Sequence, residues 1–445
     1  MVNAYRSISA GDWGAASQDL AEAARYYPWR YELNLQAGRY AYEAGEAQAA
    51  IEYLEQASKV TSLSVDDLIL LGDAYHQTGD ENMAEAIWKH STQLGETDQA
   101  YERLADLYLG RKDYASALGS LQKLLALKPS ETPLYYQIGT LFAASDPEKA
   151  LPYLIQAVEV DPTHARQAQD LYDKIRTATL FDQPAYTLLI AGRQLASMGE
   201  WEFATSAFHR ATELQPGYAD AWAFQGEARQ QVAKLESASN ADPGKAELDM
   251  AIKLDPSSIL ANTFMGIYWE RQEDYAQAQH YLERAIVYNP KDPYLYSELG
   301  NILSKAGDLP AAKSTYEQAI QLAPQDPLFY CLLAEFALEQ QIQIRELALP
   351  AARQAVSLDP DHARALDDMA QVMLMLEDYH SSERFALKAL QTEPGYAPAY
   401  LHLGTAYVFL EEPEQAKRWL NLVKTIQAEP WVSFQAQRML DYYFP

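Results

Sequence analysis

Small and apolar residues recur along this chain at a fixed spacing, which is clearest between residues 259 and 324. Gly266 corresponds to Gly300 and Pro290 corresponds to Pro324, with the same offset of 34 residues in both cases. Between these markers the apolar positions follow the 3.6-residue period of two amphipathic helices per unit. A fixed period of this size predicts an array of repeated helical hairpins.

Each repeat has small residues where its two helices would meet and a proline at its end. In the clearest copy, Gly266 and Ala278 occupy the eighth and twentieth positions, where a large side chain would keep the two backbones apart. Pro290 closes the repeat, because proline cannot continue a helix but suits the first turn of the next one. These positions resemble the pattern of the tetratricopeptide repeat family, and the resemblance covers nearly the whole chain. It implies an all-α fold: an α-solenoid of helix hairpins that forms a right-handed superhelix.

The same pattern predicts about twelve repeats, the first of them partial. Pro162 and Pro216 are 54 residues apart, so this stretch exceeds one repeat and predicts an extra helix near residues 165–176. A change of curvature or a subdomain boundary is expected there. Six surplus residues fall near residues 236–245 of a later repeat. The predicted parts are an N-terminal array (1–162), an inserted helix and loop (163–184), a C-terminal array (185–430) and a capping helix (431–445).

The first repeat begins in the middle of the pattern. Gly11, Trp13, Ala16 and Pro28 match the second half of a repeat, so a full first helix would have to begin upstream of Met1. One explanation is a shortened first helix that caps the array. The other is a chain trimmed from a longer protein, whose missing part would be a signal, a membrane anchor or another domain.

Charge and cysteine content exclude several classes of function. The net charge is −27 and no dense basic run interrupts it, so we expect no nucleic-acid partner. The single cysteine, Cys331, excludes an intramolecular disulfide and a cysteine-based zinc cluster. Because no run of 18 apolar residues occurs, we expect no membrane insertion by this segment. The expected location is the cytoplasm, or the exposed cell envelope if an upstream anchor or signal was removed.

No catalytic motif stands out in the sequence. The histidines do not form a zinc-binding spacing, and phosphate-binding loops and nucleophile elbows are missing. We therefore predict no enzyme, no catalytic residue, no cofactor and no metal. Asp73 and His76 share one face of a first helix, which fits half of a metal or ligand site or an ordinary polar groove wall. The acidic pairs Asp66–Asp67 and Asp367–Asp368 are interpreted as solvated helix surface or helix starts.

The aromatic residues fall mostly at the seams between helices. Trp88, Trp201 and Trp269 are of this kind, so we interpret them as core residues and not as stacking platforms.

The resemblance also implies a function, because tetratricopeptide domains generally bind an extended peptide or another protein in the concave groove lined by their first helices. The side chains that face the groove come from recurring positions of each first helix. Ser297 and Cys331 belong to the same register. The partner-binding residues predicted here are Arg39, Tyr42, Asp73, His76, Tyr136, Tyr186, Leu189, Arg193, Arg271, Asn301 and Lys305.

Two specialised grooves of the family are not found in this sequence. Chaperone-binding members clamp a C-terminal carboxylate with a set of Lys, Asn and Arg residues. Here Asn301 is the only asparagine at the ninth position, and Leu328 and Leu332 stand where Lys and Arg are expected. Glycosyltransferase members carry an asparagine ladder at the sixth position, a row that begins here with Gln36 and Leu70.

These observations predict a non-catalytic scaffold that binds a protein or peptide in the concave groove. Two alternatives stay open. The chain is the tetratricopeptide portion of a larger membrane-anchored bacterial cell-envelope or polysaccharide-assembly protein, or it is a regulatory subunit of an enzyme. The oligomeric state is open as well.

Overall fold

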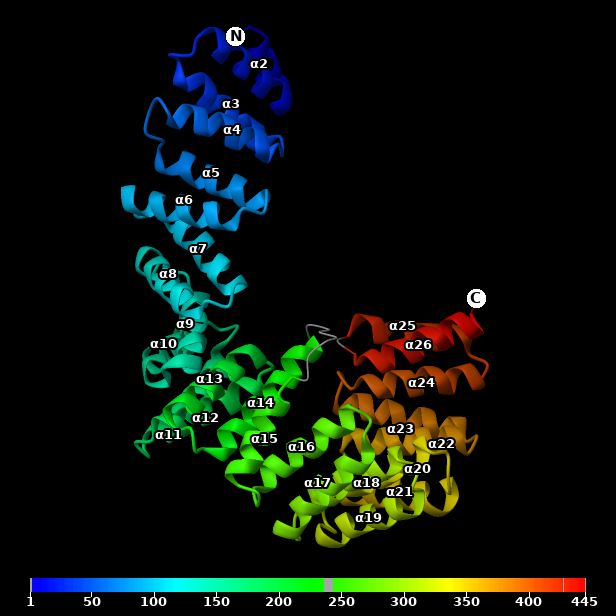
Figure 1. The fold of residues 1–445 in the computed structure, drawn as a ribbon. Helices are drawn as coiled ribbons and strands as arrows, with labels where there is room; N and C mark the ends of the chain where they lie inside the picture. The colour runs from blue at the N-terminus through cyan, green and yellow to red at the C-terminus, as the bar shows by residue number, and fades with distance from the viewer. Residues whose placement is uncertain (1, 236–242, 427, 445) are drawn as a thin grey trace. The chain divides into compact units, whose positions relative to one another are not determined.

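The computed structural model describes residues 2–235, 243–426 and 428–444, and these residues form helices and turns without a strand (Figure 1). The chain divides into two compact units, residues 1–216 and 217–445. The surplus segment predicted near residues 236–245 lies largely outside the described residues. The N-terminal unit contains α1 (Val2–Ala10), α2 (Trp13–Tyr26), α3 (Tyr31–Glu43), α4 (Ala47–Ser58), α5 (Val65–Gln77), α6 (Glu81–Leu94), α7 (Asp98–Gly110), α8 (Tyr114–Leu127), α9 (Pro133–Ser145), α10 (Pro147–Val160), α11 (Ala165–Thr179), α12 (Pro184–Ser197) and α13 (Trp201–Leu214).

The C-terminal unit continues the same alternation of paired helices. A π-helical segment, Ile344–Ala348, precedes α21, and a short 3-10 helix, Val423–Thr425, follows α25. Its α-helices are α14 (Ala219–Leu235), α15 (Lys245–Leu254), α16 (Ile259–Arg271), α17 (Tyr275–Tyr288), α18 (Pro293–Lys305), α19 (Leu309–Leu322), α20 (Pro327–Glu339), α21 (Leu349–Leu358), α22 (Ala363–Met375), α23 (Tyr379–Thr392), α24 (Ala397–Phe409), α25 (Pro413–Leu422) and α26 (Pro430–Tyr443).

The hairpins and the all-helical fold predicted from the 34-residue period are confirmed. Consecutive helices pack as pairs, such as α3 with α4, α5 with α6 and α18 with α19. The glycine at the eighth position lies where the two helices of a pair touch. A Cβ on Gly38 would stand 2.6 Å from Cγ of Leu54, which is closer than any real contact of this kind. The glycine is therefore required by the close approach of α3 and α4.

The turns inside several hairpins follow a shared design. In these turns a residue with positive φ comes first, and an aspartate that caps the second helix comes next. In one hairpin these residues are Gly79, with φ of 85°, and Asp80, whose side chain accepts a hydrogen bond from the backbone N–H of Met83. In the next hairpin Lys112 and Asp113 have the same roles. These caps satisfy backbone donors that would otherwise be unpaired at the start of α6 and α8.

The first hairpin is formed by α1 and α2. The α1 helix has nine residues, whereas α3, the first helix of the next hairpin, has 13. At the other end of the chain, α26 packs against α24 and α25. Its buried residues Val432, Ala436 and Leu440 join the apolar cluster that includes Leu420 of α25.

The extra helix α11 changes how the surrounding hairpins stack. It packs on α10 before it and on α12 after it, and its residues Ala168, Leu171, Ile175 and Ala178 are buried. As a result, α12 and α13 contact α9, the first helix of the preceding hairpin. The boundary between the two compact units lies at residues 216 and 217, beyond the segment 163–184. The domain limits taken from the sequence stay a prediction.

Candidate interaction surfaces on the first helices

Charged side chains on neighbouring first helices pair with one another along both units. In the N-terminal unit, Arg39 of α3 binds Asp67 of α5 with 2.7 Å between Nε and Oδ1. Arg103 of α7 binds Asp73 of α5 with 2.5 Å between Nε and Oδ1. Because each ion pair links two different hairpins, these contacts stabilise the stacking of neighbouring repeats.

The pair Arg39–Asp67 includes a buried carboxylate. Asp67 is 2% exposed, and it also accepts a hydrogen bond from the Ser64 hydroxyl at 2.5 Å. Burial opposes ionisation of Asp67, but the hydrogen bonds from Arg39 and Ser64 outweigh it and hold the pKa of Asp67 below its usual value. Asp67 is therefore not solvated helix surface, and that interpretation of Asp66–Asp67 is wrong for this residue. Both aspartates lie in the first turn of α5, which agrees with the alternative interpretation as a helix start.

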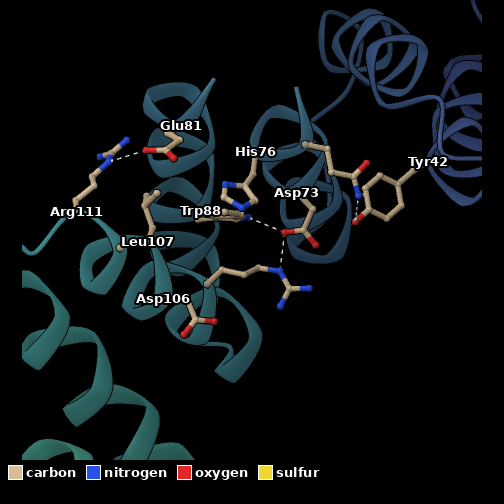
Figure 2. Close-up of a pocket in the computed structure, with 11 residues that line it drawn as sticks. Tyr42, Asp73, His76, Glu81, Trp88, Asp106, Leu107 and Arg111 are labelled. Carbon is tan, nitrogen blue, oxygen red and sulfur yellow. Dashed lines mark hydrogen bonds and ion pairs between the residues drawn. The ribbon is translucent and has the colours of Figure 1, made fainter. Parts of the chain in front are cut away.

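The N-terminal pocket is a hollow of about 430 Å³ bounded by α3, α5, α6 and α7. Asp73 lies beside Trp88, whose indole Nε1 donates to Asp73 Oδ1 at 3.1 Å, and the His76 ring lies next to the Trp88 ring (Figure 2). Burial raises the pKa of Asp106, and the nearby charge of Glu102 raises it further. The lining residues are Tyr42, Asp73, His76, Gln77, Glu81, Trp88, Arg103, Asp106, Leu107, Gly110 and Arg111.

The C-terminal pocket is larger, about 840 Å³, and is bounded by α20, α22, α24 and the start of α26. Arg364 Nε and Nη2 bind Glu335 Oε1 and Oε2 at 2.5 and 2.6 Å. His402 Nδ1 lies 2.8 Å from Asp367 Oδ1. The lining residues are Glu335, Glu339, Arg364, Asp367, Asp368, Gln371, Glu393, Gly395, Tyr396, Ala397, Pro398, His402, Glu429 and Trp431.

Asp368 is the most unusual group in the C-terminal pocket. It is 4% exposed, and among the residues that the structure describes its Oδ2 atom has no hydrogen-bond partner. Burial raises the pKa of Asp368 well above its ordinary value, and the charges of Glu335 and Asp367 raise it further. Asp367 is also buried, so the interpretation of Asp367–Asp368 as a solvated pair is wrong.

A smaller hollow of about 230 Å³, the α18–α20 hollow, adjoins the C-terminal pocket and shares Glu335 and Glu339 with it. Burial raises the pKa of Glu298, and the charge of Glu270 adds to the effect. Burial also raises the pKa of Glu339, and the charge of Glu335 raises it further. The hollow is lined by Ser297, Glu298, Asn301, Tyr316, Leu332, Glu335, Phe336 and Glu339.

The structure brings some of the predicted partner-binding residues together. Tyr42, Asp73 and His76 meet in the N-terminal pocket, where the Tyr42 hydroxyl accepts a hydrogen bond from Gln77 Nε2 at 3.1 Å. Asn301 and Lys305 both donate to Oε1 of Glu270, at 3.0 and 2.6 Å.

Other predicted residues are separate from these hollows. Arg271 binds both carboxylate oxygens of Glu227. Tyr136 stacks on His164 with 4.4 Å between ring centroids, and the Tyr186 ring meets Phe181 edge-on. Arg193 is exposed on α12, as is Arg39 on α3.

Two predicted groove residues are inside the protein. Leu189 is 4% exposed, because it occupies a face of α12 that packs against other helices. Cys331, in the same register, is also buried, and burial raises the pKa of its thiol. Neither side chain reaches the surface in this structure.

Sequence reasoning missed the residues around Asp367 and Asp368. The signal that was available is the double acid inside α22, beyond the first turn of that helix. No described group of three or more His, Cys, Asp or Glu side chains is arranged to hold a metal ion. No helix in the described ranges has the length and apolar character needed to cross a membrane.

Comparisons with known proteins match three segments to tetratricopeptide repeat families, over residues 35–90, 271–340 and 397–430. The chain is 22% identical to the BBSome complex member BBS4 homolog of Drosophila melanogaster over 303 residues, which is 65% of this chain and 57% of that protein. It is 24% identical over 212 residues to the human protein O-mannosyl-transferase TMTC1, covering 43% of this chain and 23% of that protein. The chain thus spans less than two thirds of both relatives.

Solved structures with a similar arrangement include yeast Tom70, with a TM-score of 0.45 and 13% identity over 85% of this chain and 95% of that one. Another is the Cut9–Hcn1 hetero-tetramer of the APC/C, with a TM-score of 0.40 and 14% identity over 95% of this chain and 86% of that one.

Proposed function

This chain is a tetratricopeptide repeat protein, and we propose that it is a non-catalytic scaffold that binds an extended peptide segment of a partner protein along its first helices. The observation that carries the proposal is the position of the hollows. The N-terminal pocket, the C-terminal pocket and the α18–α20 hollow are all built mainly from consecutive first helices.

The chemistry of these hollows supports binding over a purely structural role. The carboxyl groups of Asp106, Glu298 and Glu339 are costly to ionise, because burial against the hollows raises their pKa values and neighbouring acids raise them further. Groups of this kind concentrate at functional sites. A repeat array that served only as a spacer between other domains would have no use for such carboxyl groups.

The first experiment places a photo-crosslinking amino acid at one position at a time in the full chain. His76 and Gln371 line the N-terminal and C-terminal pockets, respectively. His90 and Gln391 are exposed on the second helices α6 and α23 and serve as matched controls. Irradiation in a native lysate is expected to link a partner at residues 76 or 371 and not at residues 90 or 391. Crosslinks confined to the two controls would place the partner on the second helices and contradict the proposal.

Charge reversal of Arg271 is a poor test of this function. Its guanidinium binds Glu227 and Gln230 of α14, so Arg271→Glu would set two carboxylates against each other inside the array. If the Arg271→Glu variant lost a partner, the cause could equally be a damaged fold or a missing contact between Arg271 and the partner.

Assembly of a multiprotein complex is the second candidate, and the similarity to a protein named as a BBSome complex member favours it. In complex assembly, partner proteins would contact the second helices as well as the first helices, whereas a bound peptide would contact the first helices. Crosslinks from both pockets and from both second-helix controls to more than one protein would favour assembly.

A further inference from the structure

The C-terminal pocket is strongly acidic, and its basic side chains are already engaged. Six carboxyl groups line it, together with Arg364 and His402. Arg364 is held by both oxygens of Glu335, and His402 is held by Asp367. The remaining carboxyl groups in the lining are Glu339, Asp368, Glu393 and Glu429.

Asp368 points to a ligand that donates hydrogen bonds. Buried carboxylate oxygens in proteins are almost always paired, because an unpaired one loses its hydrogen bonds to water without replacement. The Asp368 carboxyl has a hydrogen bond with the Cys331 thiol, but within the described residues its Oδ2 atom has no such partner. The Asp368 side chain lines the pocket and is nine-tenths buried or more. A cationic donor that enters the pocket would both complete this hydrogen bond and offset the repulsion from Glu335 and Asp367.

The other walls of the pocket favour a flat cation. Tyr396 and Trp431 line it together with the carboxyl groups, and Trp431 is 48% exposed. A guanidinium group stacks on aromatic faces and binds carboxylates through two parallel N–H donors, whereas an ammonium group is a compact, strongly hydrated charge. Arg364 and Glu335 already form such a two-bond contact in this pocket.

We propose that the C-terminal pocket binds an arginine side chain of the partner's peptide segment, with the carboxyl groups of Asp368 and Glu339 as its acceptors. This inference rests on the proposed function and names the chemistry of the segment that is bound. The volume of about 840 Å³ exceeds a single side chain and leaves room for the adjacent peptide backbone. The α18–α20 hollow, which shares Glu339, extends the acidic surface for a second basic residue.

The test uses the full chain and a fluorescein-labelled peptide in which two arginines alternate with glycine and serine. Two further peptides carry lysine or citrulline in place of both arginines. Fluorescence anisotropy at low salt is expected to give the tightest binding for the arginine peptide. Binding should be about tenfold weaker for lysine and still weaker for citrulline, which keeps the shape but loses the charge.

Protein variants test the residues of the pocket. Asp368→Asn keeps the shape and removes the carboxyl group that would pair with an arginine, and Glu339→Gln does the same on α20. Each is expected to weaken binding of the arginine peptide about tenfold. Glu414→Gln, at an exposed position of α25 away from the lining residues, makes the same charge change and should leave binding unaltered. Thermal unfolding should show that Asp368→Asn is at least as stable as the wild type, because it removes a carboxyl group whose ionisation is opposed by burial and by the neighbouring acids.

Several results would overturn the proposal. The wild-type chain fails to bind the arginine peptide, Asp368→Asn binds it as tightly as the wild type does, or the lysine peptide binds equally well. In each case a partner crosslinked at residue 371 would leave the proposed function standing, so the two ideas fail independently. Equal weakening by Glu414→Gln would show that only the overall charge of −27 attracts the peptide.

Discussion

Gly38 and Gly119 show how differently the same residue type is used within one array. Gly38 lies against Leu54 at the seam of a hairpin, whereas a Cβ on Gly119 of α8 would meet nothing within 4 Å. Both glycines lie inside helices, where glycine is unfavourable relative to alanine. The first is retained because of packing, and the second has no packing reason in this structure.

Gly38→Ala is expected to destabilise the protein by about 1–3 kcal/mol, because the new methyl group overfills the contact between α3 and α4. Gly119→Ala is the control and is expected to stabilise by about 0.5–1 kcal/mol through helix propensity alone. Chemical denaturation of the two variants measures both effects. A neutral result for Gly38→Ala would mean that the hairpin relaxes to admit the methyl group.

The pair Arg39–Asp67 makes stability depend on pH. Because the folded-state pKa of Asp67 lies below its unfolded value of 3.8, the ionised group stabilises the fold above pH 3.8, and this contribution is lost as the pH falls through the lower folded pKa. Arg39→Met is expected to cost about 1 kcal/mol at pH 7, less than a fully buried pair, since the Arg39 side chain is 47% exposed.

The measurement is the unfolding free energy of both proteins between pH 7 and pH 3. The difference between wild type and Arg39→Met should shrink as the pH drops below 3.8. Gln36→Met, at an exposed position on the same helix, is the control. A difference that is constant over this pH range would assign the effect of Arg39 to packing and not to the charge of Asp67.

At the scale of elements, α11 is the irregular member of the N-terminal unit. Its apolar stripe packs against α10 and α12, so it serves as a spacer between two hairpins. The period shift between Pro162 and Pro216 reveals an extra helix, but it contains no information on which helices become neighbours as a result. The contacts of α12 and α13 with α9 are decided by how α11 packs.

Leu171→Ala is expected to cost about 2–5 kcal/mol, because Leu171 is fully buried on α11. Since α11 links α10 to α12, amide hydrogen exchange should speed up in α10, α11 and α12 and stay unchanged in α3 and α4. Lys174→Ala, at an exposed position of the same helix, should alter neither region. Faster exchange spread evenly over the N-terminal unit would contradict the role of α11 as a local spacer.

At the scale of the whole molecule, charge and repetition act together. The chain carries 62 acidic and 35 basic residues, and several of the basic residues on first helices are paired with acids of neighbouring repeats. A surface of this kind attracts a basic partner from a distance and disfavours an acidic one. The arginine-binding role proposed for the C-terminal pocket is consistent with this net charge.

The sequence by itself determined the hairpin fold. The 34-residue offset, the glycines at the eighth position and the closing prolines are local requirements of one hairpin, so they are visible without knowledge of distant contacts. The sequence also indicated which positions of each first helix share a face, and Tyr42, Asp73 and His76 at such positions line one pocket.

Only the tertiary structure decided which polar residues are buried and which are paired. Asp368 and Leu189 occupy ordinary helix positions, and their burial depends on helices from other parts of the chain. Asp367 is paired with His402, and Arg271 is paired with Glu227. In both cases the partner belongs to another hairpin. A repeat pattern specifies how one hairpin folds. The charge and accessibility of a groove arise instead from contacts between hairpins. Those contacts depend on the distance and direction of each side chain.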